Sequence, residues 1–149
     1  YCQRATANRI ECSKKRSQGS SKKIALNIPK LKDCKYHLGD AKGDDTMIFI
    51  TEGDSASGSM VGCRNPMTQA IFSLRGKPLN MFGKRRAEIY RNEELFNLMT
   101  ALGIENDISG LRYNKIIIAT DADNDGFHIR NLMLTFFLGF FACIVKLCL

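Results

Sequence analysis

The 149-residue sequence lacks the residue patterns, such as metal-binding motifs, with which small proteins supplement a hydrophobic core. It has six cysteines but no Cys-x-x-Cys pair, and only two histidines, His37 and His128. No zinc-finger or zinc-ribbon spacing can be assembled from this set. Only three prolines occur and no collagen-like or heptad repeat is present, which excludes the fibrous classes. A chain of this length can bury a core of its own without such supports.

Long hydrophobic runs and a recognisable signal peptide are also lacking. The most continuous apolar stretch, residues 132–145, is 14 residues long and contains Thr135 and Gly139. A membrane span needs about 20 such residues, so we expect a core helix there and no membrane as a partner. Because nothing near residue 1 has the pattern of a signal peptide, we expect free thiols in a cytosolic protein rather than a disulfide framework.

Acidic residues are almost absent from residues 1–30. This segment holds eight basic side chains and one acid, Glu11, and so accounts for the whole net charge of +7. Its Ser- and Lys-rich part, residues 12–23, is typical of a solvated linker. A nucleic-acid contact is the alternative, because Lys and Arg release counterions from phosphates. Charge alone favours the linker.

Short apolar runs alternate with helical patterns in the remainder. The runs predict strands over residues 46–51, 69–74 and 115–120. Helices are expected from about residue 54 to 64, over 93–102 with Gly103 as the stop, and from Phe127 onward. Strands that alternate with helices in this way indicate an α/β fold with a parallel sheet.

Aspartates stand at alternate positions, 121, 123 and 125, directly after the 115–120 strand, and Glu52 follows the 46–51 strand. In an extended tip, Asp121, Asp123 and Asp125 project from one face and repel one another unless a cation neutralises them. Ligands gather at the carboxyl ends of parallel strands, and oxygen-only ligands suit Mg²⁺. The alternative is a polar loop that caps the next helix. The combined pattern favours a metal site.

Three other types of site fit the sequence less well. An EF-hand loop needs a glutamate at its twelfth position, where this chain has Leu132, and it follows a helix rather than a strand. An aspartyl-phosphate phosphatase needs a lysine and further acids downstream, but after Gly126 the sequence has one lysine, Lys146, and no acid. The Gly-x-Ser-x-Gly elbow of hydrolases lacks its second glycine, which is Ser57 here. This hydrolase interpretation is weak and is kept open only by His128.

A basic loop, Arg75-Gly76-Lys77, follows the 69–74 strand. The glycine between two cations allows backbone and side chains to approach a phosphate together, although most such loops are simply solvated. His128 falls on the first turn of the last helix, where a capping or packing role is the plainer interpretation.

Three motifs together resemble the toprim domain of type IIA DNA topoisomerases. They are Glu52-Gly-Asp-Ser-Ala56, the stretch from Ser73 to Asn80 (SLRGKPLN), and the stretch from Asp121 to Arg130 (DADNDGFHIR). Their order and spacing follow the family over about residues 30–140. The resemblance implies a Rossmann-like toprim fold, a short parallel sheet flanked by helices. It divides the chain into a basic linker, 1–30, from an upstream domain, and a toprim domain, 31–149, that we expect to be incomplete at its C-terminal end.

The resemblance also implies roles for individual residues. Glu52 corresponds to a metal ligand and general acid/base, and Asp121, Asp123 and Asp125 correspond to metal ligands. Arg75 and Lys77 correspond to the basic loop beside the cleaved DNA, and His128 to the start of the following helix. The chain is thereby expected to bind Mg²⁺, for which Mn²⁺ or Ca²⁺ can substitute, and double-stranded DNA.

The implied function is DNA cleavage and religation with a tyrosine from an A subunit, in a cytoplasmic, nucleoid-associated bacterial heterotetramer. ATP would bind only in an N-terminal domain that this sequence does not contain, and the chain should be inactive alone. Details such as the stretch from Leu111 to Lys115 favour a topoisomerase IV B subunit. A gyrase B subunit and a non-catalytic nucleic-acid-binding module remain the alternatives.

Overall fold

A single mixed sheet organises the computed structural model, which describes residues 28–105 and 108–147. Its strands are β1 (Leu31–Lys32), β2 (Met47–Glu52), β3 (Gln69–Leu74) and β4 (Lys115–Ala119), in the order β1-β3-β2-β4. Strands β3, β2 and β4 run parallel, and β1 pairs antiparallel with β3 at the edge. The predicted α/β fold with a parallel sheet is therefore confirmed, with the addition of one short antiparallel strand.

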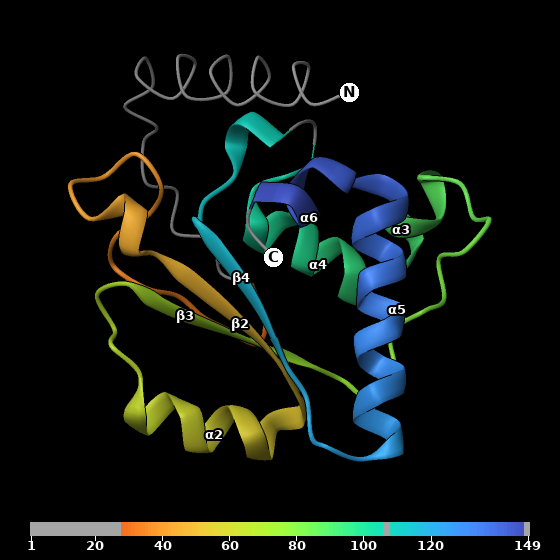
Figure 1. Ribbon diagram of the computed structural model, residues 1–149, viewed down its shortest axis with the longest axis horizontal. Helices are drawn as coiled ribbons and strands as arrows, with labels where there is room; N and C mark the ends of the chain where they lie inside the picture. The colour runs from red at the N-terminus through yellow and green to blue at the C-terminus, as the bar shows by residue number, and fades with distance from the viewer. Residues whose placement is uncertain (1–27, 106–107, 148–149) are drawn as a thin grey trace.

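Helices cover both faces of this sheet, as Figure 1 shows. One face carries α2 (Gly53–Cys63), and the other carries α4 (Glu93–Leu102), α5 (Asn124–Phe140) and α6 (Ala142–Leu147). The shorter elements are α3 (Ala87–Arg91) and the 3₁₀ turns η2 (Gly43–Asp45) and η3 (Ile108–Gly110). In the described residues, no helix combines the length and the apolar character needed to cross a membrane.

The main core lies between the sheet and α4, α5 and α6. Alternate residues of β2, Ile48 and Ile50, are fully buried, as the two-residue period of a strand requires. Aromatic side chains fill the space around them, including Phe72, Tyr113 and Phe136. Removing each such side chain from water contributes about 1.5–3 kcal/mol to the stability of the fold. This core layer therefore holds the sheet in place.

Helix α4 has the limits that its sequence predicts. The Asn92 side chain accepts a hydrogen bond from the backbone N–H of Leu95 at 2.9 Å and caps the first turn. The helix ends at Gly103, whose φ of 73° is a left-handed conformation that glycine adopts without strain. The predicted helix over 93–102 and the predicted strand over 69–74 are both confirmed.

The other predicted elements differ in their limits: β4 ends at Ala119 rather than residue 120, and α2 spans Gly53–Cys63 rather than about 54–64. Strand β2 is shifted by one residue, so that Glu52 is its last residue rather than the first residue after it. Helix α5 begins at Asn124 rather than Phe127, because the Asp123 side chain caps it three residues earlier. The predicted extended tip therefore stops at Asp123, and Asp125 lies in the first turn of α5.

The predicted linker, residues 1–30, falls mostly outside the described residues. Its last three residues are described: Ile28 is part of the core, and the backbone oxygen of Lys30 accepts a hydrogen bond from the Ser73 N–H. The chain from residue 28 onward thus already packs against the sheet.

Candidate functional site

The parallel strands bring their carboxyl ends to one edge of the sheet. Glu52, at the end of β2, lies opposite Leu74, at the end of β3. On the other side, Thr51 lies opposite Ala119, the last residue of β4. Neighbouring strands are about 4.8 Å apart, so Glu52 stands between the loop that follows β3 and the acidic segment that follows β4.

Glu52 is the least satisfied group at this edge. Its Oε2 atom is buried and has no hydrogen-bond partner in the described part of the chain. Burial raises the pKa of its carboxyl group, and the negative charges of Asp123, Asp121 and Asp125 raise it further. Glu52 is therefore stable here either as the protonated acid or as a carboxylate next to a cation.

The acidic loop after β4 folds tightly against the start of α5. The Asp123 Oδ1 atom accepts a hydrogen bond from the Gly126 N–H at 2.6 Å, which caps the helix. A Cβ atom on Gly126 would lie only 2.1 Å from the Asp121 backbone oxygen, so this close approach requires glycine. The capping interpretation thus applies to one oxygen of Asp123, while the carboxylates of Asp121 and Asp123 remain exposed to solvent.

The third aspartate of the motif pairs with the basic loop. Lys77 Nζ lies 2.8 Å from Asp125 Oδ1. This contact lowers the pKa of Asp125 and raises the pKa of Lys77, so both groups stay charged. The pair joins the loop after β3 to the first turn of α5, across the edge where Glu52 lies.

Sequence reasoning missed a second polar contact beside the site. Asp54, in the first turn of α2, accepts a hydrogen bond from the Ser73 hydroxyl at 2.7 Å. Lys30 Nζ lies 3.3 Å from the same carboxylate. These two contacts lower the pKa of Asp54 and tie α2 to the end of β3. Nothing in the local sequence signals the contacts, because the three residues lie far apart in the chain.

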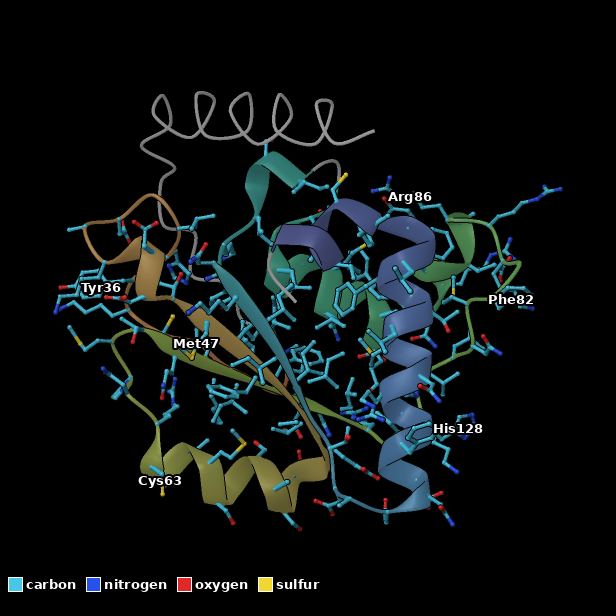
Figure 2. The ribbon with its side chains drawn as sticks, viewed as in Figure 1. Tyr36, Met47, Cys63, Phe82, Arg86 and His128 are labelled. Atoms are coloured by element: carbon cyan, nitrogen blue, oxygen red, sulfur yellow. The ribbon has the colours of Figure 1, made fainter. Side chains whose placement is uncertain are left out.

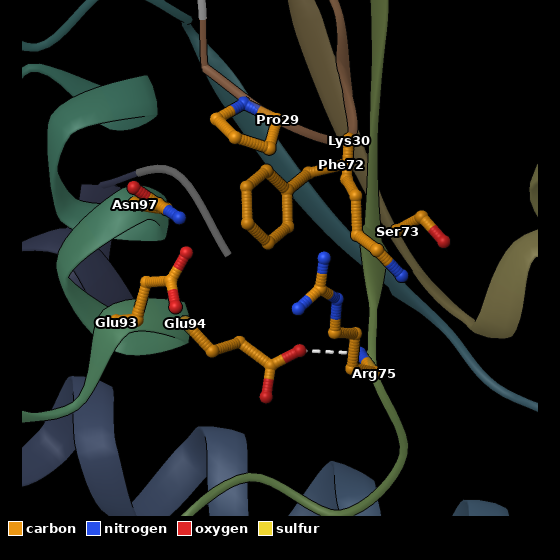
Figure 3. Close-up of a pocket in the computed structure, with 8 residues that line it drawn as sticks. All are labelled: Pro29, Lys30, Phe72, Ser73, Arg75, Glu93, Glu94 and Asn97. Atoms are coloured by element: carbon orange, nitrogen blue, oxygen red, sulfur yellow. Dashed lines mark hydrogen bonds between the residues drawn. The ribbon is translucent and has the colours of Figure 1, made fainter.

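Glu94 was missed as well. Its carboxylate accepts a hydrogen bond from the backbone N–H of Arg75, the residue at which the chain leaves β3 (Figure 3). The contact lies at a cavity of about 30 Å³ between β3 and α4, which has room for water and not for an organic cofactor. Glu94 thereby holds the base of the basic loop.

Two further residues of the third motif lie on α5. His128 is exposed on α5, and its charge contributes to the lowered pKa of Asp125. The guanidinium of Arg130 lies 4.9 Å from the ring centroid of Phe127 on the same helix. The structure therefore brings Glu52, the three aspartates and Lys77 together, and leaves His128 at the periphery of the site.

A more compact group of potential ligands lies elsewhere in the described residues. Ligand atoms of Asp33, Cys34 and His37 lie within 4.8 Å of one another. Arg112 already forms an ion pair with Asp33, and its Nη2 atom is 2.7 Å from His37 Nε2. A guanidinium in this position disfavours a cation. Burial acts to raise the pKa of Asp33, but hydrogen bonds from His37 and Tyr113 and the Arg112 charge outweigh it and hold the pKa well below its usual range.

The donors at the acidic edge suit hard cations such as Mg²⁺, Mn²⁺ or Ca²⁺. They are oxygens only, and one of them, Glu52 Oε2, is buried without a partner in the described residues. In the described residues, only the ligand atoms of Asp33, Cys34 and His37 all lie within 4.8 Å of one another. No three carboxylates of the acidic edge in the described chain therefore lie that close together. A cation here would complete its coordination with water and phosphate oxygens, as Mg²⁺ does.

Known proteins are similar to this chain in sequence and in fold. The chain is 66% identical over 130 residues to the B subunit of DNA topoisomerase 4 from Borreliella burgdorferi, a match that covers 86% of this chain and 22% of that protein. It is 42% identical over 138 residues to the B subunit of DNA gyrase from Staphylococcus epidermidis, with 90% of this chain and 22% of that protein covered.

A solved structure agrees with these relatives. The DNA-binding, cleavage and re-ligation domain of Plasmodium falciparum topoisomerase II superposes with a TM-score of 0.73 at 30% identity, over 84% of this chain and 18% of that chain. The chain thus spans about a fifth of the length of the relatives it matches. Residues 47–147 match the Toprim domain, which includes all the predicted site residues. The chain belongs to the toprim domain family, and its relatives are type II topoisomerases.

Proposed function

We propose that this chain is the Mg²⁺- and DNA-binding part of a type II topoisomerase B subunit. In this role it would take part in cleaving and rejoining double-stranded DNA together with an A subunit that carries the tyrosine nucleophile. The topoisomerase IV type is favoured over gyrase, because the identity to the topoisomerase 4 relative is 66% against 42% for the gyrase relative.

The single observation that carries the proposal is the buried, unpartnered Oε2 atom of Glu52 beside three aspartates in the described part of the chain. A strand end with a purely structural role has no reason to bury a carboxylate oxygen among like charges, because this costs free energy unless a proton or cation compensates. A group whose pKa is raised in this way is suited to proton transfer.

The proposed reaction needs proton transfer at one oxygen. When the tyrosine oxygen bonds to phosphorus, it gives up its proton to solvent, the bond between phosphorus and a deoxyribose oxygen breaks, and that oxygen must take up a proton. Burial and the neighbouring aspartates raise the pKa of Glu52, so its protonated form can donate this proton at the sheet edge. Glu52 takes the proton back when the deoxyribose oxygen attacks the phosphorus of the phosphotyrosine and rejoins the strand, and the departing tyrosine oxygen recovers a proton from solvent. The same carboxyl group thus acts as acid in cleavage and as base in religation.

The other residues at this edge of the sheet would bind the metal ion and the DNA backbone. Asp121 and Asp123, and Glu52 once it has given up its proton, would hold Mg²⁺, which would supply positive charge to the pentavalent phosphate. Asp125 acts mainly through Lys77, whose position it fixes. Arg75 and Lys77 present cations to the DNA backbone. Mn²⁺ or Ca²⁺ can substitute in binding.

The wider assembly is part of the same proposal, which the subunit names of the relatives support. The full protein would form a heterotetramer with its A subunit in the cytoplasm, at the nucleoid. ATP would bind in an upstream domain of the full-length protein. His128 has a peripheral electrostatic role in this arrangement rather than a direct one.

The proposal can be tested on the chain as it stands with Mn²⁺ as a paramagnetic probe. We expect Mn²⁺ to broaden the NMR signals of residues around the acidic edge, and Glu52→Gln to weaken this effect about tenfold or more, as loss of a charged ligand does. Asp44→Asn is the matched control, because Asp44 is an exposed acid on η2, which precedes β2. Equal broadening in the Glu52→Gln and unmodified chains would contradict the metal assignment.

A second measurement addresses the reaction. The full-length protein that carries this segment, combined with its A subunit, should cleave plasmid DNA when Mg²⁺ is present. Glu52→Gln should remove cleavage, because glutamine cannot donate or accept the proton. Cleavage by the Glu52→Gln protein at the normal rate would exclude Glu52 as the acid and base.

A further inference from the structure

We propose that the turn formed by residues 80–85, here called the Phe82 turn, is an additional DNA-binding surface that extends the basic loop away from the acidic edge. This inference rests on the function proposed above and names further residues that the DNA would contact. Its partner is the backbone of double-stranded DNA, with Phe82 against the sugars and base edges.

Positive charge is concentrated in this part of the chain. Residues 75–87 carry five basic side chains and no acid: Arg75, Lys77, Lys84, Arg85 and Arg86. The whole of residues 31–149 has equal numbers of acids and bases, so the five form a local excess. A patch of this kind attracts the phosphate backbone and releases its counterions.

The turn presents an aromatic ring to solvent. Met81 is 2% exposed and anchors the turn in the core, whereas Phe82, the next residue, is 81% exposed. The Asn80 side chain accepts a hydrogen bond from the Phe82 N–H at 3.0 Å, and the Lys84 N–H donates to the Met81 oxygen at 3.1 Å. Gly83, with a φ of 68°, allows this tight reversal. Figure 2 shows Phe82 at the margin of the molecule, beyond α5 and pointing away from the sheet.

Two of the cations in the turn are available for an outside partner. Arg86 is engaged, since its Nη2 atom donates to the Glu105 backbone oxygen at 2.8 Å and its guanidinium lies 5.5 Å from the Phe141 ring centroid. Lys84 and Arg85 are exposed and form no ion pair or side-chain hydrogen bond within residues 28–105 and 108–147. Arg86 therefore fixes the end of the turn, and its neighbours face solvent.

The turn is continuous with the proposed cleavage site. Lys77 is held at the acidic edge by Asp125, and Lys84 follows it in the same loop. Seven residues of chain span at most about 25 Å. At about 3.4 Å per base pair, the turn would contact phosphates within roughly seven base pairs of the site. One duplex can thus touch both the basic loop and the Phe82 turn.

Charge favours DNA over a protein as the occupant. A protein partner would have to supply acids for Lys84 and Arg85, whereas every DNA sequence supplies phosphates at regular spacing. Exposed apolar side chains next to such cations can also pack on sugars or enter between base steps. The contribution of the two cations to DNA affinity should then depend on salt concentration, and the contribution of the Phe82 ring should not.

The test measures binding of a labelled DNA duplex to the chain between about 50 and 200 mM salt. In the double variant Lys84→Gln/Arg85→Gln, the slope of log K against log [salt] should become shallower by about 1.8, since each lost phosphate contact removes about 0.9. Phe82→Ala should lower affinity by the same factor at every salt concentration, with the slope unchanged. The matched control is Lys42→Gln/Lys115→Gln, two exposed lysines that precede β2 and begin β4 and therefore lie at the opposite edge of the sheet.

Several outcomes would overturn the inference. Equal slope changes in the two double variants would mean that only net charge matters, and no change in the Lys84 and Arg85 variant would exclude a contact. If Phe82→Ala leaves DNA binding unchanged but weakens binding of the A subunit, the turn is a protein interface. The proposed function fails separately, if the unmodified chain binds neither the duplex nor Mn²⁺, and the inference then fails with it.

Discussion

Replacing Gly126 by alanine tests whether the acidic loop is as tightly closed as the structure indicates. The new Cβ atom would lie 2.1 Å from the Asp121 backbone oxygen and 3.0 Å from the Asp121 backbone carbon and nitrogen. Cβ contacts below 3.0 Å are essentially never seen, and the atoms in the way belong to the backbone. The loop or the first turn of α5 must therefore move by about 1 Å, which separates the acidic segment from the helix.

The expected cost follows from two opposing contributions. Overpacking of this kind destabilises proteins by about 1–3 kcal/mol or more. Alanine gains up to about 1 kcal/mol over glycine in a helix, which offsets part of it. We expect a net loss of about 1–2 kcal/mol in the free energy of unfolding, which lowers Tm by about 2–4 °C per kcal/mol in a chain of this size.

Gly139 provides a control in the same helix. A Cβ atom at Gly139 meets nothing within 4 Å, so Gly139→Ala should be neutral or stabilising by up to about 1 kcal/mol. Urea unfolding followed by circular dichroism measures both variants. If Gly126→Ala is as stable as Gly139→Ala, the close approach of Gly126 to Asp121 does not exist in solution and the reasoning is refuted.

Three further predictions concern charge. Glu52 has a raised pKa in the folded chain, so its contribution to stability is present below the ordinary value of 4.5 and is lost as pH rises through the folded pKa. Unfolding measured as a function of pH should therefore show no such loss in Glu52→Gln. A pH profile equal to that of the unmodified chain would contradict the burial of Glu52. Asp33 has a lowered pKa, so its contribution is present above the ordinary value of 3.8 and is lost as pH falls; Asp33→Asn should destabilise the chain at pH 7 and much less in strong acid, as thermal unfolding at both pH values would record. Asp123→Asn keeps a side-chain oxygen for the α5 cap and removes only the charge, so we expect an unchanged Tm with steeply reduced Mg²⁺-dependent cleavage in the full-length protein; a large drop in Tm would mean that the charge itself supports the helix.

The sheet and the placement of the acidic residues were predictable from short-range patterns. The run Gln69–Leu74 is apolar and bounded by turn residues, which sufficed to give both ends of β3. The meeting of Glu52 with the residues after β4 followed from one geometric rule, that parallel strands end at the same edge. The helical spacing of 93–102, closed by a glycine, gave α4.

Contacts between distant side chains were not predictable in this way. The pairs Lys77–Asp125, Ser73–Asp54 and Glu94–Arg75 each join two elements, and their partners depend on packing that no local pattern encodes. Strand β1 is only two residues long and exists because it pairs with β3. The early start of α5 was missed because the capping power of Asp123 was weighed against metal binding, whereas its two oxygens allow both.

The pairing of β2 with β4 has a consequence for how the site comes into being. Thr51 lies opposite Ala119, 68 positions further along the chain, whereas β2 and β3 pair across a much shorter connection through α2. Contacts between residues so far apart carry a large loop-closure entropy and tend to form late in folding. Glu52 and the aspartates therefore have no common location until the last strand joins the sheet. A partly folded chain that already contains β2, α2 and β3 would lack the acidic edge altogether, and metal affinity would appear in the same kinetic step as the complete sheet.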